Sequence, residues 1–320
     1  MKKFKLFSFL FVMMLSSFTA CDKEETGSGN GNENENENGG VEININPENL
    51  GQGEIYIKAT PENDYGYYEL GFNIVADKLT IDWGDGTVEE KTNVQNLYHR
   101  YENQNARVVV LATEGLSMFG CYTNMYGLLS SSFDGYFEEI RFGSCPNLSE
   151  IYFWGGDNRE YLKLKKVDIT KLTALKRFWC LGEKDLSNLD VTKNTNLKVL
   201  EINKSNLSNL NLSNNVKLDT LRCSSSKLST LNISANTALK YLDFSENQLS
   251  VINVENNKSL NYVNCCENQL SLNSLIELFQ ALPSTTNGRI TFCSNPGTED
   301  AHFGGHASQI LSSKGWDYTW

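Results

Sequence analysis

The chain has 320 residues, of which 40% are hydrophobic and 21% are charged, a composition typical of globular proteins and long enough for about two domains. Its formal net charge of −11 predicts an acidic surface. Because such a surface repels phosphate backbones, we do not expect nucleic acid as a partner.

The first 20 residues are typical of a secretory signal peptide. Lysines precede an apolar run over residues 6–15, which is shorter than the roughly 20 residues that a membrane-spanning helix needs. Residues 17–21, SFTAC, resemble a bacterial lipobox, with Phe18 where Leu is usual. The resemblance implies cleavage before Cys21 and lipid on its thiol and amine, which gives stable membrane anchoring. An ordinary secreted protein cleaved nearby is the alternative.

Residues 21–40 carry the lipidated Cys and are predicted to form a flexible tether. Segment 22–40, DKEETGSGNGNENENENGG, has no large apolar side chain to bury and therefore cannot fold. Its acidic start resembles the signal that sends lipoproteins to the outer face in some Gram-negative groups, whereas Asp after the lipidated Cys means inner-membrane retention in others. We expect an outer-membrane protein, anchored by lipid on Cys21 and facing the cell exterior.

Residues 41–113 are predicted to form an antiparallel β-sandwich, and residues 114–136 a connector or N-terminal cap. Apolar and polar residues alternate, as in half-buried strands, over the segments 54–59, 67–74, 79–88 and 106–113. The GDG sequence at 84–86 favours a hairpin turn, because Gly and Asp tolerate a positive φ.

Segments 82–87 (DWGDGT), 98–101 (YHRY) and 108–113 (VVVLAT) together resemble a PKD-type immunoglobulin-like domain. The resemblance implies a spacer or adhesion module. The carboxylates of Asp82 and Asp85 lie beside a Gly turn, where they would suit Ca²⁺. They equally suit hydrogen bonds to turn amides, which is the interpretation we favour. His99, in the second segment, is expected to be a packed or capping residue of the fold.

Residues 137–271 repeat with a period near 21 residues. Each full copy contains the pattern L-x-x-L-x-apolar twice, and a copy can bury its apolar edge only against a stacked neighbour. The copies begin at Leu148, Leu175, Leu197, Leu218, Leu239 and Leu260. The pattern resembles the leucine-rich repeat, with Asn247 and Asn268 at its Asn position and Ser replacing Asn at positions 205 and 226. We expect a solenoid with short strands on both sides of each coil.

Residues 272–320 are predicted to cap the solenoid, since its end would otherwise expose the core. Apolar residues at helical spacing over 271–283 favour a helix that Pro283 ends, and residues 288–297 predict a strand. The predicted fold class is mainly β: an immunoglobulin-like (PKD-type) β-sandwich, a leucine-rich repeat solenoid with short strands, and a C-terminal cap of helix and strand.

The outward positions of the first strand in each copy form the candidate binding surface. Aromatic residues and Arg at such positions are typical of binding surfaces, and solenoids commonly bind through this concave face. The candidate ligand-binding residues are Tyr152, Trp154, Arg177, Trp179, Glu201, Arg222, Tyr241, Asp243 and Tyr262. Alternatively, some of these aromatic residues pack on each other or under an insertion at 155–161.

A polar ladder occupies the matching positions of the second side of each coil. It consists of Asp168, Asp190, Asn211, Asn232 and Asn253. Ca²⁺ would fit there, but we favour stacked side chains that bond each other.

The remaining cysteines favour neither a disulfide framework nor a zinc site, because their count without Cys21 is odd and no CxxC occurs. Cys180, Cys223 and Cys265 share an inward position and are expected in the core. Cys266 and Cys293 share an outward position, where a disulfide is one option.

No catalytic motif stands out. His302 and His306 are four positions apart in EDAHFGGH, but the Glu of HExxH is missing and two glycines weaken a helix there. We therefore expect no enzyme, no metal site and no cofactor. The predicted function is non-catalytic binding or adhesion at the cell surface, with an extracellular or host protein as ligand. The alternatives are a glycan ligand stacked on the aromatic column and a structural role in the envelope.

Overall fold

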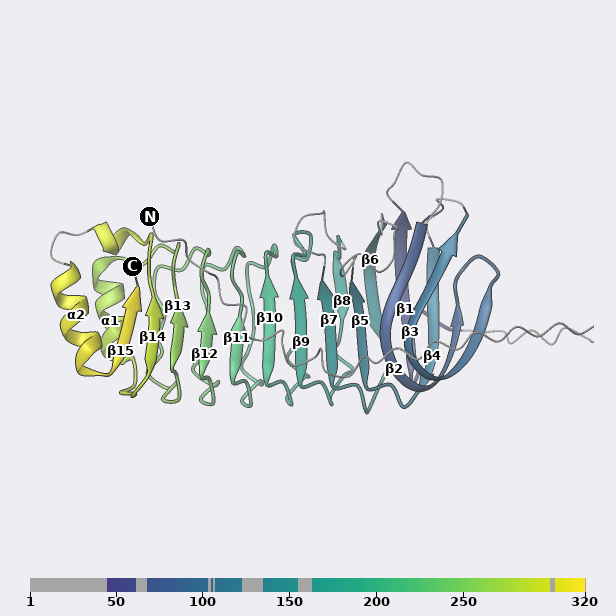
Figure 1. Cartoon of the computed structure of the whole chain (residues 1–320), viewed down its shortest axis with the longest axis horizontal. Coiled ribbons are helices and arrows are strands. Elements are labelled where there is room, and N and C mark those ends of the chain that lie inside the picture. Colours follow the sequence, from purple (N-terminus) through teal and green to yellow (C-terminus); the bar gives the residue numbers. More distant parts are fainter. Residues whose placement is uncertain are drawn as a thin grey trace, which may run out of the picture. The chain divides into compact units, whose positions relative to one another are not determined.

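The computed structural model describes residues 45–61, 68–102, 105, 107–122, 135–154, 163–299 and 303–319. The segment Val41–Trp320 forms one compact unit (Figure 1). The predicted signal peptide, Cys21, the tether, the 155–161 insertion and His302 lie outside the described residues. In the part of the chain that the structure describes, no helix is long and apolar enough to cross a membrane.

Short parallel strands, one from each copy, form the regular part of the sheet (Figure 1). They are β7 (Glu150–Trp154), β9 (Arg177–Leu181), β10 (Val199–Asn203), β11 (Thr220–Arg222), β12 (Tyr241–Asp243) and β13 (Tyr262–Asn264). Consecutive strands pair in register, so that the buried Leu200 faces Phe178 on one side and Leu221 on the other. The structure therefore confirms the predicted solenoid of stacked coils.

The second side of the coils differs from the prediction of short strands. There β6 (Gly135–Phe142) pairs with β8 (Lys166–Asp168), but the later copies have no strand on this side within the described residues. The polar ladder forms Asx turns on this side, at the end of β8 as well as in the copies without a strand. Asp190 Oδ1 accepts the backbone N–H of Thr192 at 2.8 Å, and the Asn residues of later copies make the same bond to their own turns. These residues form local Asx turns. Contrary to our expectation, their side chains do not bond each other.

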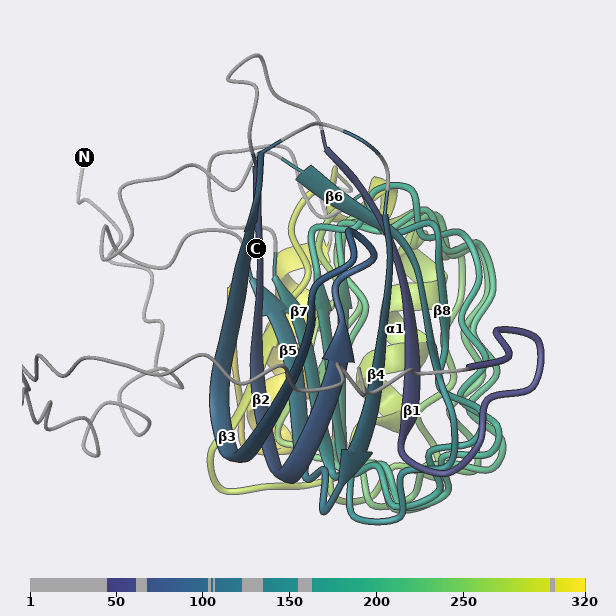
Figure 2. The same ribbon diagram turned by 90° about the vertical axis from the view of Figure 1, so that its right-hand side faces the viewer.

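The strands before the repeats belong to the same sheet as the repeats. They are β1 (Glu54–Pro61), β2 (Tyr68–Asp82), β3 (Val88–Tyr101), β4 (Arg107–Glu114) and β5 (Met118–Tyr122). The sheet runs from β7 through β5, β2, β4 and β1 to β6 and β8, with β3 beside β2. Because β8 lies on the second side of a coil, this path turns around the end of the solenoid and closes it (Figure 2).

The described residues thus do not show a PKD-type sandwich with two sheets of its own. Ile57, Ile81 and Leu111 on β1, β2 and β4 are fully buried in the same apolar cluster as the repeats. Phe119 of β5 packs on Phe142 and Phe153, with ring centroids 5.2 and 6.5 Å apart. The alternating pattern correctly predicted half-buried strands, but it carries no information on which apolar layer they cover.

Small and large side chains alternate along one column of the core. The column comprises Cys121, Phe153, Cys180, Ile202, Cys223, Phe244, Cys265 and Phe292, all 1% exposed or less. Burial raises the pKa of the Cys180 thiol well above its ordinary value, as the core assignment of the cysteines predicts. Each Cys leaves room for the bulky neighbours above and below it, which keeps the stacked coils closely packed.

Two ladders of buried Asn bind one coil to the next. Asn247 Oδ1 accepts the N–H of Leu228, and its Nδ2 donates to the carbonyl of Cys223 in the preceding copy. Asn268 repeats this arrangement, as the leucine-rich repeat pattern implies. A second ladder, which the sequence analysis missed, consists of Asn194, Asn215, Asn236 and Asn257. Its signal in the sequence is an Asn at every 21st position.

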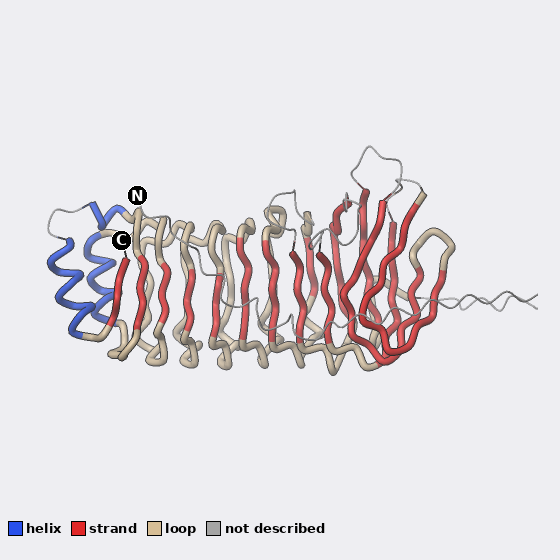
Figure 3. The backbone as a smooth tube through the Cα atoms, in the orientation of Figure 1, coloured by secondary structure: helices blue, strands red, loops and turns tan. Residues whose placement is uncertain are grey.

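Helices are confined to the C-terminal end of the described unit (Figure 3). The elements of this end are α1 (Leu272–Ala281), β14 (Gly288–Thr291), the 3-10 helix η2 (Pro296–Glu299), α2 (Phe303–Ser313) and β15 (Trp316–Thr319). Ser271 caps α1 by accepting the N–H of Ser274, and β14 and β15 extend the parallel sheet. A disulfide joins Cys266 to Cys293 and ties the last copy to the cap.

Candidate ligand-binding face

The outward side chains of β7 and β9 to β13 lie in register; we call this surface the strand face. One row holds Tyr152, Trp179, Glu201, Arg222 and Asp243. The neighbouring row holds Glu150, Arg177, Val199, Thr220, Tyr241 and Tyr262. Eight of the nine candidate residues therefore lie in two adjacent rows. Trp154 pairs with Leu181 through the backbone, and its side chain lies outside the described residues.

Tyr241 stands between two neighbours that cover both faces of its ring. On the side of β13, the ring of Tyr262 is parallel to it, with centroids 4.1 Å and planes 5° apart. On the side of β11, the guanidinium carbon of Arg222 lies 5.1 Å from the ring centroid, and Arg222 Nη2 donates to the Tyr241 hydroxyl at 3.1 Å. The three side chains form a stack that runs along the solenoid axis.

Two carboxylates flank Arg222 within its own row. Glu201, only 7% exposed, accepts a long hydrogen bond of 3.5 Å from Arg222 Nη1. Burial favours the neutral form of Arg222, but Tyr241, Glu201 and Asp243 outweigh it and raise its pKa above the ordinary value. Asp243 is also 7% exposed and accepts hydrogen bonds from the backbone N–H and hydroxyl of Ser245. Arg222 therefore remains charged and fixed in place.

A second group of aromatic and charged residues lies two strands before the stack. Arg177 forms an ion pair with Glu150 of the adjacent strand. Tyr152 lies over Gly120 of β5, where a Cβ atom would come within 2.3 Å of its ring. Trp179 pairs with Tyr152 through the backbone and is half-buried. Gly120 is thus the position that allows the Tyr152 ring to lie against the sheet.

Arg289 of β14 is a residue of this face that the sequence analysis missed. It pairs in register with Tyr262 and is exposed, which extends the row of the stack into the cap. The signal was hidden because 27 residues, and not 21, separate Tyr262 from Arg289. The helix α1 occupies the extra length.

The turn that follows β2 uses its carboxylates for hydrogen bonds to its own backbone. Asp82 Oδ1 accepts the N–H of Gly84 at 2.8 Å, and Asp85 Oδ1 accepts that of Thr87 at 3.0 Å. His99 lies 2.7 Å from the other oxygen of Asp85 and stacks on the Trp83 ring. Within the described residues no cluster of three or more His, Cys, Asp or Glu side chains is arranged to hold a metal ion.

No protein-family model matches the chain, and no curated protein matches it. Among solved structures, the functional domain of InlJ from Listeria monocytogenes is similar at 21% identity and a TM-score of 0.40, over 52% of this chain and 43% of that chain. The internalin InlF from the same organism is similar at 18% identity and a TM-score of 0.39, over 54% of this chain and 67% of that chain. The LRIM1/APL1C complex is similar at 17% identity and a TM-score of 0.35, over 55% of this chain and 34% of that chain.

This chain spans less than half of the InlJ chain. The coils and Asn ladders of the structure itself carry the assignment of the solenoid.

Proposed function

We propose that the protein is a non-catalytic binding or adhesion protein that recognises a protein ligand through the strand face. The observation that carries this proposal is the stack of Arg222, Tyr241 and Tyr262, which is already ordered by its own contacts. Tyr and Arg dominate binding energy at protein interfaces, and side chains fixed before binding lose little conformational entropy on association.

A glycan ligand on the same face is the second candidate. Sugars stack on the faces of aromatic rings, but both faces of Tyr241 are covered by Arg222 and Tyr262. The half-buried Tyr152 and Trp179 leave this candidate open at the other end of the face. A structural role in the envelope is the third candidate. It requires that another component of the envelope cover the aromatic residues.

We further propose that lipid on Cys21 anchors the protein in the outer membrane, with the tether of residues 22–40 holding the solenoid outside the cell. The lipobox-like SFTAC sequence supports the anchor. The disulfide between Cys266 and Cys293 supports an oxidising compartment, because such bonds persist in the periplasm and outside the cell.

The PKD-like segment fits this proposal as an N-terminal cap. Tyr101 donates from its hydroxyl to the Trp83 carbonyl at 2.8 Å, and Trp83 Nε1 donates to Glu89. These contacts link the WGDG turn to the His-x-Tyr segment and support a PKD-like module at 41–113 that has merged with the repeat sheet.

The test is a screen of the full chain against arrays of extracellular-matrix proteins and glycans, beside the variants Tyr262→Ala and Trp179→Ala. We expect a protein hit that Tyr262→Ala weakens at least tenfold. A glycan hit that only Trp179→Ala weakens would establish the second candidate. A hit that both variants retain would refute the strand face as the binding site.

A further inference from the structure

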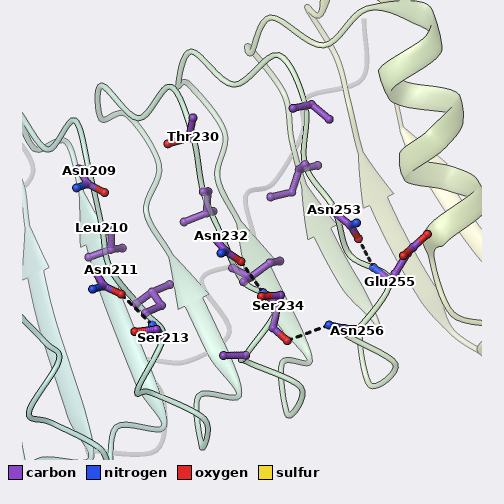
Figure 4. Close-up of a pocket in the computed structure, with 16 residues that line it drawn as sticks. Asn209, Leu210, Asn211, Ser213, Thr230, Asn232, Ser234, Asn253, Glu255 and Asn256 are labelled. Carbon is purple, nitrogen blue, oxygen red and sulfur yellow. Dashed lines mark hydrogen bonds between the residues drawn. The ribbon is translucent and has the colours of Figure 1, made fainter.

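A groove crosses three successive copies on the second side of the coils (Figure 4). Its lining comes from residues 209–213, 230–235, 251–253 and 255–256, and its volume is about 590 Å³. This volume lies within the range of roughly 300–1,000 Å³ that is usual for ligand pockets. None of the candidate residues of the strand face lines it.

At the groove, neighbouring coils are joined by Asn side chains, which donate to the carbonyls of Leu212, Ile233 and Ser234, and not by paired strands. On the strand face, backbone bonds hold neighbouring coils together. In the described structure, residues 209–211, 230–232 and 251–253 make no backbone hydrogen bonds to one another. Leu210, Leu231 and Ile252 form the floor of the groove and are only 5–8% exposed.

A row of amide donors lines the groove above this apolar floor. Asn211, Asn232 and Asn253 each use Oδ1 to accept the N–H two residues further on, at 3.1, 3.0 and 2.8 Å. Their Nδ2 groups make no hydrogen bond within the described residues, and all three side chains are exposed. Figure 4 shows these residues at equivalent places in consecutive coils.

The lining is almost uncharged. It contains one carboxylate, Glu255, and neither Lys nor Arg, in a chain with a net charge of −11. Hydroxyl and amide groups of Asn, Ser and Thr make up the polar part. A charged ligand would lose its hydration without gaining a partner of opposite charge, so this chemistry favours a neutral polar ligand.

We propose that this groove is a second binding site, which takes a neutral linear oligosaccharide running along the solenoid axis. The Asn amides donate to sugar hydroxyl and ring oxygens, and the exposed Val251 contacts the C–H face of a sugar ring. Paired strands on the strand face are roughly 4.8 Å apart, and the Asn ladder keeps the coils in contact beside the groove, so identical donors recur once per coil at about this spacing. A 1,4-linked pyranose chain advances by a similar distance per unit and rotates successive units about its axis, so consecutive coils donate to different edges of consecutive sugars.

An extended peptide fits this periodicity less well. It advances by roughly 3.3 Å per residue, so its carbonyls fall out of step with the coils within a few residues. The inference is independent of the proposed protein ligand, because the two sites share no residue.

The test is isothermal titration calorimetry of the full chain with cellohexaose, chitohexaose, xylohexaose and mannohexaose. The diagnostic variant is the triple change Asn211→Asp, Asn232→Asp and Asn253→Asp. It removes the donors but keeps the turns, because Asp168 and Asp190 make the same turns in earlier copies. The single change Asn209→Ala, at an exposed lining residue, is a second variant that leaves these turns untouched.

We expect one of the hexasaccharides to bind the wild-type chain, the triple variant to lose at least tenfold in affinity, and Asn209→Ala to lose severalfold. Tyr262→Ala on the strand face should leave this binding unchanged, and circular dichroism should show that each variant is folded. Absence of binding by all four hexasaccharides would overturn the proposal. The proposal would also be overturned if both groove variants bound the hexasaccharide with the affinity of the wild type. It would equally be overturned if Tyr262→Ala were the only variant to lose affinity.

Discussion

The rings of Tyr241 and Tyr262 lie parallel, with centroids 4.1 Å apart, on neighbouring strands exactly one 21-residue period apart in the sequence. Parallel pairing in register places equivalent side chains beside each other at roughly the strand separation. The repeat therefore creates the stack, and Arg222 extends it toward β11. The side chains of the stack on the strand face are therefore ordered by contacts with each other.

The two stacked rings should stabilise each other. In a double-mutant cycle of Tyr241→Ala and Tyr262→Ala, we expect a coupling energy of about 0.5–1.5 kcal/mol in urea unfolding, because aromatic pairs gain energy beyond buried area. Tyr98 of the N-terminal cap, which is 66% exposed, serves as the control. The cycle of Tyr241→Ala with Tyr98→Ala should be additive. Additivity in the Tyr241 and Tyr262 cycle would mean that the stack contributes no energy of its own.

The second Asn ladder should matter for stability. Asn236 is fully buried, and its Nδ2 donates to the carbonyls of Leu212 and Asn215. Asn236→Ala leaves both carbonyls without this donor, so we expect a loss of about 2 kcal/mol in the free energy of unfolding. The exposed Asn214, which donates to Thr192, is the matched control, with an expected change below about 0.5 kcal/mol for Asn214→Ala. Equal losses in chemical denaturation would contradict the role of the ladder.

Reduction should destabilise the C-terminal end. The disulfide joins positions 27 residues apart, and a closed loop of this length corresponds to roughly 3.5 kcal/mol of stabilisation. We expect dithiothreitol to lower the melting temperature of the wild-type chain. The variant Cys266→Ser with Cys293→Ser should melt at the lower temperature and show no response to the reductant. If the variant responds as strongly as the wild type, another bond is being reduced.

Acid should weaken the contact between β6 and its neighbours. Hydrogen bonds from Arg141 and Lys166 hold the pKa of Glu139 below its usual range. A carboxyl with a lowered pKa in the folded state stabilises the fold above its unfolded pKa of about 4.3 and loses this contribution as the pH falls below it. Glu139→Gln should therefore show a smaller loss of stability between about pH 5 and pH 3 than the wild type. Glu102→Gln, at an exposed carboxylate, should leave the slope unchanged.

The proposed anchor depends on one side chain. Cys21→Ser should abolish the incorporation of labelled palmitate and move the protein from the membrane to the soluble fraction, because serine has no thiol to carry the lipid. Cys145→Ser, which changes a buried cysteine of the fold, should keep both the label and the membrane location. Labelling of the Cys21→Ser chain would rule out this residue as the site.

The sequence by itself determined the solenoid and its register. Leucines at 21-residue intervals specify which side chains point inward, and the outward rows follow, because strand residues alternate between the two faces of a sheet. The same periodicity correctly placed Asn247 and Asn268 as residues that bind the backbone of the neighbouring coil.

Only the tertiary structure decided how these elements are used. Alternation along β1 to β4 indicates strands but not their partners, and long-range pairing joined them to the repeats as a cap. The later copies pair no strands on their second side within the described residues, and the groove lies there, beside the Asx turns of Asn211, Asn232 and Asn253. Arg289 joined the strand face only because α1 folds away from the sheet between Tyr262 and β14. Pairing partners, local turns and inserted elements depend on contacts that a periodic pattern does not encode.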